Sequence, residues 1–385
     1  MTMTIFRFPT RAAALLLAGC ATAAVAAPLP RFPPAAVWNQ NVENATPHPS
    51  SGTMISTLAA LNTPSSCPGS GSGFGCGRMQ IDFSIHVVHA TPGAPTATLV
   101  GIPGGTPDNG DGYYLPDCDA LGSAVPVPAG AAIEGQPGMS CDVFGNDCHF
   151  LVVDGNLLHE VYRANLAGNE LQAQCLATWR LDVVYPPEGR GEHCTSADAA
   201  GFPIAPLLFN ADEIAASLAL DATGGGDIGH AIRFILPNAR MASDATLTGA
   251  RFGRLYVRPA SHAGGPSGPV GSVPYGSRLR LRADFPLAGY NAAARVILNT
   301  LKRYGMVLAD GGNIALTAES DMYTTAKWAT LGINARVFDQ SAGARVVAVS
   351  DFAVLDTGPR IAETYNCVRT AVALDIVFSN GFESP

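Results

Sequence analysis

The sequence predicts a mostly β protein, specifically an antiparallel β-sandwich of the jelly-roll type with one or two short helices. Three observations support this fold class. Glycine (42 residues) and proline (29 residues) are spread along the 385-residue chain, which is typical of short strands joined by tight turns. Alternating, β-branched segments recur, beginning with Met79–Ala90. Strong helical periodicity is confined to Asn291–Gly305. A second β-rich lobe in the N-terminal half is the alternative architecture.

The chain begins with the features of an export signal. Arg7 and Arg11 precede the apolar run AAALLLAGCATAAVAA, which ends in small residues. We expect residues 1–27 to be a signal peptide cleaved after AVAA; the alternative is the lipobox-like LLAGC, with Cys20 lipidated. Both predict an extracellular, periplasmic or outer-membrane-associated protein. No other apolar run approaches the ~20 residues that span a bilayer, so we expect no transmembrane segment.

We expect an extended, loop-rich segment over residues 28–78, the β-sandwich domain over 79–374 and a short tail over 375–385. The cysteines fit an oxidising compartment, because eight of the nine lie beyond the signal and an even number allows up to four disulfides. The loop CPGSGSGFGC makes Cys67–Cys76 the expected local bridge. The spacing leaves the other pairs open.

Several elements follow in order. Two apolar runs around Asp154-Gly155-Asn156 predict a hairpin within Cys148–Leu166, continued by Cys175–Tyr185 as a meander. Phe209–Leu220 predicts a short helix with Asn210 as its N-cap. Gly224–Asn238 predicts a central strand, with His230 and Arg233 on opposite faces. Met306–Ala318 predicts a second hairpin around Asp310–Asn313.

Composition excludes several classes of protein. The net charge is −8 and the chain has only two lysines, so nucleic-acid binding is not expected. The sequence has no H-E-x-x-H, P-loop or dinucleotide-binding motif, and we expect no cofactor and a monomer. A structural calcium ion is nevertheless possible, because one loop contains four aspartates, although their spacing is not that of an EF-hand: Asp108, Asp111, Asp117 and Asp119.

Long sequence blocks resemble a family of exported bacterial β-rich proteins. They run from about Trp38 to about Trp328 and include NQNVENATPHPSS, HFLVVDGNLLHEVYRA, CTSADAAGFPIAPLLFNADEIAA, GHAIRF, RPASH and LKRYGMVLADGGN. Relatives have TSADAAG-, HALRF- and RYGM-x-LAD-like blocks. The resemblance implies export and a single β-rich architecture, but no particular activity. Here LADGGN departs from the LADNGS of the family, which puts a role for this turn's side chains in doubt.

The resemblance marks polar positions that carry chemistry. These are Ser196, Asp198, Asp212, Glu213, His230, Arg233, His262 and Asp310. From these and other ionisable residues we predict activity on a polysaccharide, with hydrolysis favoured over lyase-type elimination. Glycoside hydrolysis needs two carboxyl groups across a cleft. Elimination needs a base, a proton donor and a cation on the substrate carboxylate. The predicted catalytic residues are Asp212, Glu213, His230, His262 and Asp310.

Arg233, Arg258, Tyr256 and Trp179 are the predicted substrate-binding residues, because arginine binds carboxylates and aromatic rings stack on sugars. Structural roles compete with these assignments. Asp212 and Glu213 suit a helix N-terminus, Asp310 suits a turn, and Glu160 and Asp182 suit exposed strand positions. The alternative function is a non-catalytic glycan-binding or structural envelope protein, since β-rich folds serve both uses.

Overall fold

The computed structural model describes Met1 and residues 30–61, 73–75, 78–103, 116–339 and 344–370. Within these residues the chain is mostly strands, with three α-helices, so the β-rich prediction is confirmed. A six-stranded sheet has the order β1-β15-β11-β14-β13-β16. Its strands are β1 (Ile81–Ile85), β15 (Leu316–Glu319), β11 (Ile232–Leu236), β14 (Met306–Gly311), β13 (Arg278–Leu281) and β16 (Phe352–Val354).

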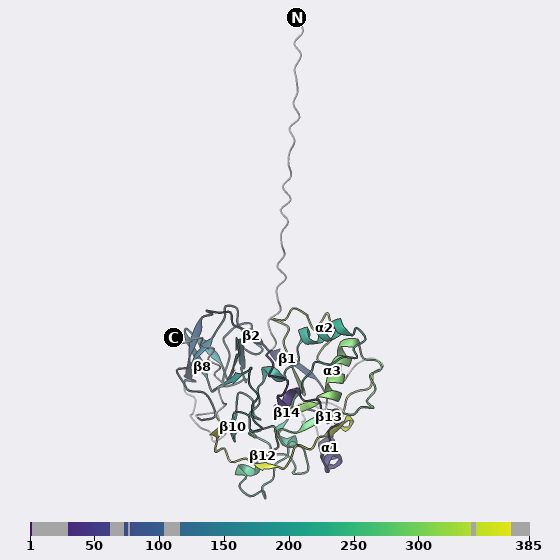
Figure 1. Ribbon diagram of the computed structural model, residues 1–385. Helices are drawn as coiled ribbons and strands as arrows, with labels where there is room; N and C mark the ends of the chain where they lie inside the picture. Colours follow the sequence, from purple (N-terminus) through teal and green to yellow (C-terminus); the bar gives the residue numbers. More distant parts are fainter. Residues whose placement is uncertain (2–29, 62–72, 76–77, 104–115, 340–343, 371–385) are drawn as a thin grey trace, which may run out of the picture.

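Two four-stranded sheets lie beside the large one, at the left of Figure 1. The first contains β2 (Val87–His89), β5 (Phe150–Asp154), β6 (Leu157–Tyr162) and β9 (Cys175–Arg180). The second contains β4 (Ala124–Pro126), β3 (Thr96–Gly101), β8 (Glu170–Ala173) and β7 (Asn165–Ala167). We call the part built from β2 to β9 the small lobe, and the remainder of the described chain the large lobe.

The remaining elements are short. Two-stranded pairs join β10 (Gly191–Glu192) to β18 (Val368–Arg369) and β12 (Leu255–Tyr256) to β17 (Ile361–Ala362). The α-helices are α1 (Ser51–Ala60), α2 (Ala211–Leu220) and α3 (Ala292–Arg303). Single 3-10 turns are η1 (Val37–Asn39), η2 (Ala205–Leu207), η3 (Asn238–Arg240), η4 (Arg251–Gly253) and η5 (Val349–Asp351). Among the described residues, no helix combines the length and apolar character of a membrane span.

The sheet β2-β5-β6-β9 separates two hydrophobic cores. Leu151 and Val153 of β5 belong to the core of the large lobe. The alternate residues Phe150 and Val152 belong to a second core, which also takes Leu171 from the other four-stranded sheet. Successive strand residues point to opposite faces, so a strand buried on both sides must be apolar throughout. The sequence of β5, FLVVD, is apolar except for its last residue, Asp154. This second core corresponds to the alternative of a β-rich lobe in the N-terminal half.

Local patterns predicted several elements correctly. β5 and β6 form the expected hairpin, Gly155 of its turn has φ 57°, and β9 continues it as a meander. Asn210 caps α2 through a capping box with Glu213, and the apolar stripe of α3 is fully buried. The strand β11 is central, between β15 and β14, but it spans only Ile232–Leu236, so His230 lies before the strand and not on one of its faces.

Three expectations differ from the structure. The sheets are mixed rather than antiparallel, because β1–β15, β11–β14, β2–β5 and β3–β8 are parallel pairs, and a jelly-roll arrangement is not confirmed. Residues 306–318 do not form a hairpin, because β11 lies between β14 and β15 and pairs with both. The segment 28–78 is not extended throughout, since it contains α1, which buries Met54, Ile55 and Leu58.

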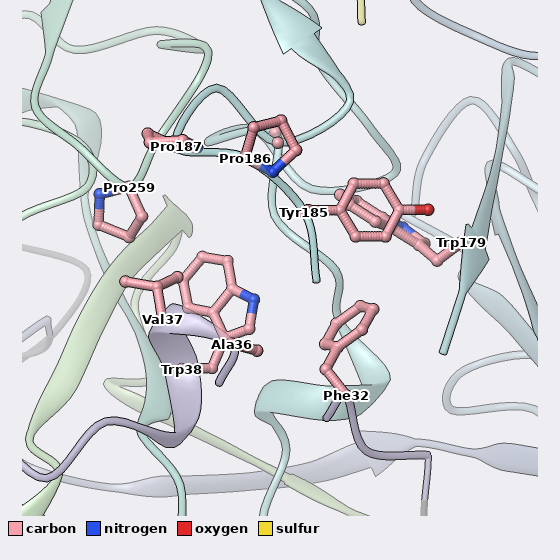
Figure 2. Close-up of a pocket in the computed structure, with 11 residues that line it drawn as sticks. Phe32, Ala36, Val37, Trp38, Trp179, Tyr185, Pro186, Pro187 and Pro259 are labelled. Atoms are coloured by element: carbon pink, nitrogen blue, oxygen red, sulfur yellow. The ribbon is translucent and has the colours of Figure 1, made fainter. Parts of the chain in front are cut away.

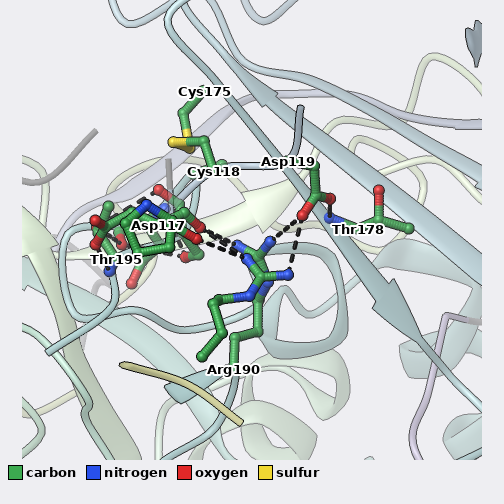
Figure 3. The surroundings of a disulfide bond; sticks show 12 residues. Asp117, Cys118, Asp119, Cys175, Thr178, Arg190 and Thr195 are labelled. Atoms are coloured by element: carbon green, nitrogen blue, oxygen red, sulfur yellow. Dashed lines mark hydrogen bonds and ion pairs between the residues drawn. A yellow bond between two sulfur atoms is a disulfide. The ribbon is translucent and has the colours of Figure 1, made fainter. Parts of the chain in front are cut away.

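Three disulfides cross-link the described residues: Cys118–Cys175, Cys141–Cys148 and Cys194–Cys367. The expected Cys67–Cys76 bridge lies outside these residues. Arg190 lies beside the first disulfide and binds Asp119 through Nη2 at 2.6 Å (Figure 3).

Two of the four aspartates of the expected calcium site, Asp117 and Asp119, lie in this region. Asp119 is also bound by Arg369 at 3.1 Å, and Asp117 accepts the backbone N–H of Thr195. Two arginines therefore already compensate Asp119. Asp108 and Asp111 lie outside the described residues. Asp117 also lies near the sulfurs of Cys194 and Cys367, but these are joined to each other and cannot act as thiolate ligands.

We expect the disulfide that closes the longest loop to contribute most to stability. The double substitution Cys194→Ala and Cys367→Ala should lower the free energy of unfolding by about 2–5 kcal/mol, because the bridge restricts a 173-residue separation in the unfolded chain. Urea denaturation followed by circular dichroism measures this loss. The matched variant Cys141→Ala and Cys148→Ala opens a separation of only 7 residues and should lose less. An equal or larger loss there would contradict the expectation.

Candidate functional site

A polar cleft with a volume of about 420 Å³ opens between the two lobes. This volume lies in the range of small-molecule binding sites, which often form where two lobes meet. The small lobe supplies one wall, with Asp147, Tyr162, Arg163 and Gln174. The large lobe supplies the other wall, with Ala197, Ala199, Asn238, Arg254, Gly264, Gly265, Tyr275, Asp310 and Gly311.

Two glycines allow the backbone to approach closely at the wall of the large lobe. A Cβ atom on Gly311 would lie 2.9 Å from Oδ1 of Asn238, and one on Gly264 would lie 2.9 Å from Cβ of Ala199. Both distances are too short for ordinary contacts. Larger residues at these positions would therefore displace the wall, so the shape of the cleft depends on these glycines.

Asp310 is the residue of this wall that is best suited to donate or accept a proton. It lies near the end of β14, next to a register irregularity between β11 and β14. Arg233 of β11 lies behind it, with Nη2 at 2.5 Å from Oδ1 of the buried Asp198 and 3.7 Å from Oδ2 of Asp310. One guanidinium thus faces two carboxyl groups. Three separate sequence blocks, TSADAAG, GHAIRF and LADGGN, supply these three residues.

This arrangement sets the protonation of Asp310. Burial and the negative charge of Asp198 raise the pKa of Asp310 to about 7, although Arg233 acts in the opposite direction. Asp198 directly contacts Arg233 while Asp310 is farther away, so Asp310 is the less strongly compensated of the two carboxyl groups and the one that takes up a proton more readily. Its side chain is 26% exposed, so the proton can reach a molecule in the cleft.

A buried ion pair lies below the cleft. His149 Nδ1 is 2.7 Å from Oε2 of Glu134, and its Nε2 is 3.1 Å from the carbonyl oxygen of Ala197 in the cleft wall. Burial alone would lower the pKa of His149, but Glu134 raises it to about 9. For Glu134, the effect of His149 outweighs burial and lowers the pKa to about 2. His149 is therefore a cation beneath this wall at neutral pH.

The other predicted catalytic residues do not line this cleft. Glu213 is bound by Arg31 at 2.6 Å and by His230 Nε2 at 3.2 Å, so the structure does bring Glu213 and His230 together. Glu213 also completes the capping box of α2. Asp212 accepts the backbone N–H groups of Thr325 and Ala326. These contacts satisfy the carboxylates within the fold.

The predicted His262 and the predicted substrate-binding residues lie elsewhere. His262 is fully buried, and its Nδ1 lies 2.7 Å from the carbonyl oxygen of Ala199. Tyr256 and Arg258 both bind Glu192. Arg233 is buried behind Asp310, and it reaches Thr317 as well as Asp198. Asp212, His230, His262 and Asp310 therefore do not share one cleft.

Trp179 does not offer a surface for stacking a sugar. It is 2% exposed, and its Nε1 donates to Oε2 of the buried Glu160 at 3.0 Å. Its ring lies in a small apolar pocket of about 20 Å³, edge-on to Phe32 and Tyr185 (Figure 2). The pocket is too small for a sugar ring, so these aromatic residues act in packing.

Sequence reasoning missed most of the cleft residues. Asp147, Arg163, Gln174, Asn238 and Arg254 lie in turns or at strand ends, where polar residues are ordinary, and nothing in their local sequence distinguishes them. Of the polar residues that the sequence analysis singled out, Asp310 lines the cleft, and Asp198 and Arg233 lie behind it.

Comparison with known proteins gives no significant match: no family model, no curated protein and no solved structure is similar to this chain.

Proposed function

We propose that this protein hydrolyses a polysaccharide bound in the cleft between the lobes, with Asp310 as general acid and Asp147 as the second carboxyl group. Asp310 gives its proton to the leaving glycosidic oxygen as the bond from the anomeric carbon to that oxygen breaks. Asp147 takes a proton from the water whose oxygen forms the new bond to that carbon. Hydrolysis by two carboxyl groups in different environments follows this division of roles.

The observation that carries the proposal is the pairing of environments on opposite walls. Asp310 lies near Asp198 and Arg233, and its raised pKa of about 7 leaves it protonated below that pH, whereas Asp147 is exposed at the edge of the small lobe. Gln174 and Asn238 add amide groups that both donate and accept hydrogen bonds, as sugar hydroxyls require.

Export is part of the same proposal. The three disulfides support an oxidising compartment outside the cytoplasm, where a polysaccharide of the cell wall or the environment would be met. The apolar N-terminal run and its two alternative cleavage sites support the same location.

The proposal is tested by incubating the purified protein with a panel of neutral and uronic polysaccharides. New reducing ends without absorbance from an unsaturated product support hydrolysis. An unsaturated product would contradict hydrolysis and indicate elimination. Retention of a polysaccharide without any product would also contradict it and indicate a non-catalytic binding protein.

The pH dependence of the rate provides a separate prediction. Asp310 must be protonated to act as general acid, and its pKa is raised to about 7. Well below pH 7 Asp310 is fully protonated, so its titration should not change kcat/KM. Well above pH 7 it loses its proton, and we expect kcat/KM to fall about tenfold per pH unit. Initial rates between pH 5 and 9 on one substrate measure this limb. A rate that rises through pH 7 would contradict the assigned role.

A further inference from the structure

A turn at the rim of the cleft, Arg251–Phe252–Gly253–Arg254, exposes an aromatic ring beside two guanidinium groups, which also lie over the ring of Tyr365. Phe252 is 67% exposed. The guanidinium carbons of Arg251 and Arg254 lie 5.1 Å and 5.3 Å from its ring centroid, within the range of cation–π contact. Arg254 also lines the cleft and donates from Nη1 to Tyr365 Oη at 2.5 Å. Phe252 does not itself line the cleft, but its exposed ring is only two residues along the turn from Arg254, which does.

The backbone at this rim is in an unusual conformation. Among the described residues, five non-glycine residues have positive φ. Two of them, Phe252 (57°) and Tyr365 (59°), lie at this rim, and a third, Arg163 (54°), lies on the opposite wall of the cleft. L-residues rarely adopt such angles, and they persist where surrounding structure enforces them, often at functional sites. Here the next residue, Gly253, fixes the turn, because a Cβ atom on it would lie 2.9 Å from the backbone nitrogen of Ala245.

Arg163 faces the same cleft from the small lobe. Its Nη1 donates to Oε1 of Gln174 at 3.0 Å, and its guanidinium lies 5.4 Å from the ring of Tyr162. A guanidinium has five N–H donors, so this contact with Gln174 leaves capacity for an anionic ligand. Arg163 and Arg254 thus present arginine on both walls of one cleft.

We propose that the cleft binds an acidic polysaccharide, whose uronate carboxylates contact Arg163 and Arg254 while a neighbouring sugar ring stacks on Phe252. The inference rests on the proposed function and names its substrate class. A protein with a net charge of −8 repels a polyanion on average, so a uronic chain requires cationic groups where it binds. Arginine suits this role because its planar donors match a carboxylate.

Binding to the Asp310→Asn variant, which should bind without turnover, tests the inference by calorimetry. The probes are tetramers of galacturonate, glucuronate and mannuronate, and each of these with its carboxylates reduced to alcohols. A sulfated galactose tetramer distinguishes carboxylate recognition from general anion binding. We expect one uronic tetramer to bind at least tenfold tighter than its reduced counterpart and than the sulfated tetramer. Its affinity should also fall as salt is added, a measurement that needs no further variant.

Variants locate the contact. Arg163→Gln and Arg254→Gln should each weaken uronate binding about 10- to 100-fold and affect the reduced tetramer much less, as expected for loss of a charged hydrogen bond. Phe252→Ala should weaken both tetramers. Arg282→Gln is the control, because this exposed arginine pairs with Asp284 and does not line the cleft. Unfolding midpoints of all variants are measured in parallel.

The outcomes separate this inference from the proposed function. Equal binding of uronic and reduced tetramers, or unchanged uronate binding in both arginine variants, overturns the substrate class. Cleavage of a neutral polysaccharide alone also overturns it while supporting hydrolysis. Tight uronate binding without cleavage by the wild-type protein supports the substrate class and overturns hydrolysis.

Discussion

Replacing Asp310 by Asn is expected to lower kcat/KM on the cleaved polysaccharide about 10²- to 10⁴-fold, the usual contribution of a general acid. The amide keeps the size of the side chain but has no acidic proton to give to the leaving oxygen. The substitution also removes the repulsion between the two carboxyl groups that face Arg233, and Arg233 keeps its contact with Asp198, so the fold should be retained. Initial rates and unfolding midpoints on the same preparations check both expectations.

Two further variants make this test specific. Asp147→Asn should also reduce kcat strongly, because the opposite wall then has no group to accept the proton of water. Asp284→Asn is the control, since Asp284 is 79% exposed and does not line the cleft. Asp310 is not the general acid if Asp310→Asn retains activity within about threefold of the wild type.

The second large effect is expected at Glu160, where Glu160→Leu should lower the free energy of unfolding by about 3–6 kcal/mol. Glu160 is fully buried and accepts three hydrogen bonds: from the backbone N–H of Ile204 at 2.7 Å, from that of Ala205 at 2.8 Å and from Trp179 Nε1 at 3.0 Å. Each donor left buried without a partner costs about 1–3 kcal/mol. Urea denaturation at pH 7 measures the change.

Matched variants show whether hydrogen bonding explains this loss. Glu160→Gln keeps an oxygen for Ile204 and Ala205 but turns an N–H group toward Trp179, so its loss should be smaller, about 1–3 kcal/mol. Asp182→Asn, on an exposed carboxylate that pairs with Arg180, should change stability by less than about 0.5 kcal/mol. Equal losses for Glu160→Leu and Glu160→Gln would contradict the hydrogen-bond explanation.

Glu160 also shows where sequence reasoning ends. The pattern of β6 identified the strand correctly, because periodicity and turn residues are local properties. Whether a carboxylate on that strand meets water or the 204–205 backbone depends on a loop more than forty residues later in the chain. No local pattern carries that information, so the sequence indicated an exposed strand position for Glu160, whereas the structure buries it fully.

The same limit explains the misassigned hairpin and the mixed sheets. Asp310–Asn313 has good turn chemistry, yet β14 and β15 both pair with β11 instead of with each other. Ile81 of β1 pairs with Leu316 of β15, at nearly opposite ends of the described chain. Turn propensity is only a local preference. Here the burial of β11 between β14 and β15 contributes more to stability than a direct hairpin between those two strands.

For the site, sequence identified one wall residue, Asp310, and also Arg233 behind it. It did not identify the opposite wall, because Asp147 and Arg163 belong to the small lobe and become neighbours of Asp310 only when the lobes meet. Glu213 and His230 were both among the predicted catalytic residues, and they do contact each other, but Arg31, near the N-terminal end of the described chain, takes part in this cluster and makes it structural.

The strand order of the large sheet has a consequence for how this chain folds. Its edge strand β1 is synthesised early, but its partner β15 comes only after the whole small lobe and most of the large lobe. The small lobe consists of pairings within residues 87–180 and can assemble first. Distant pairings slow folding, so we expect the large lobe to complete its sheet only after synthesis is nearly finished. Such a delay suits the export that we propose, because an exported chain crosses the membrane before it becomes compact.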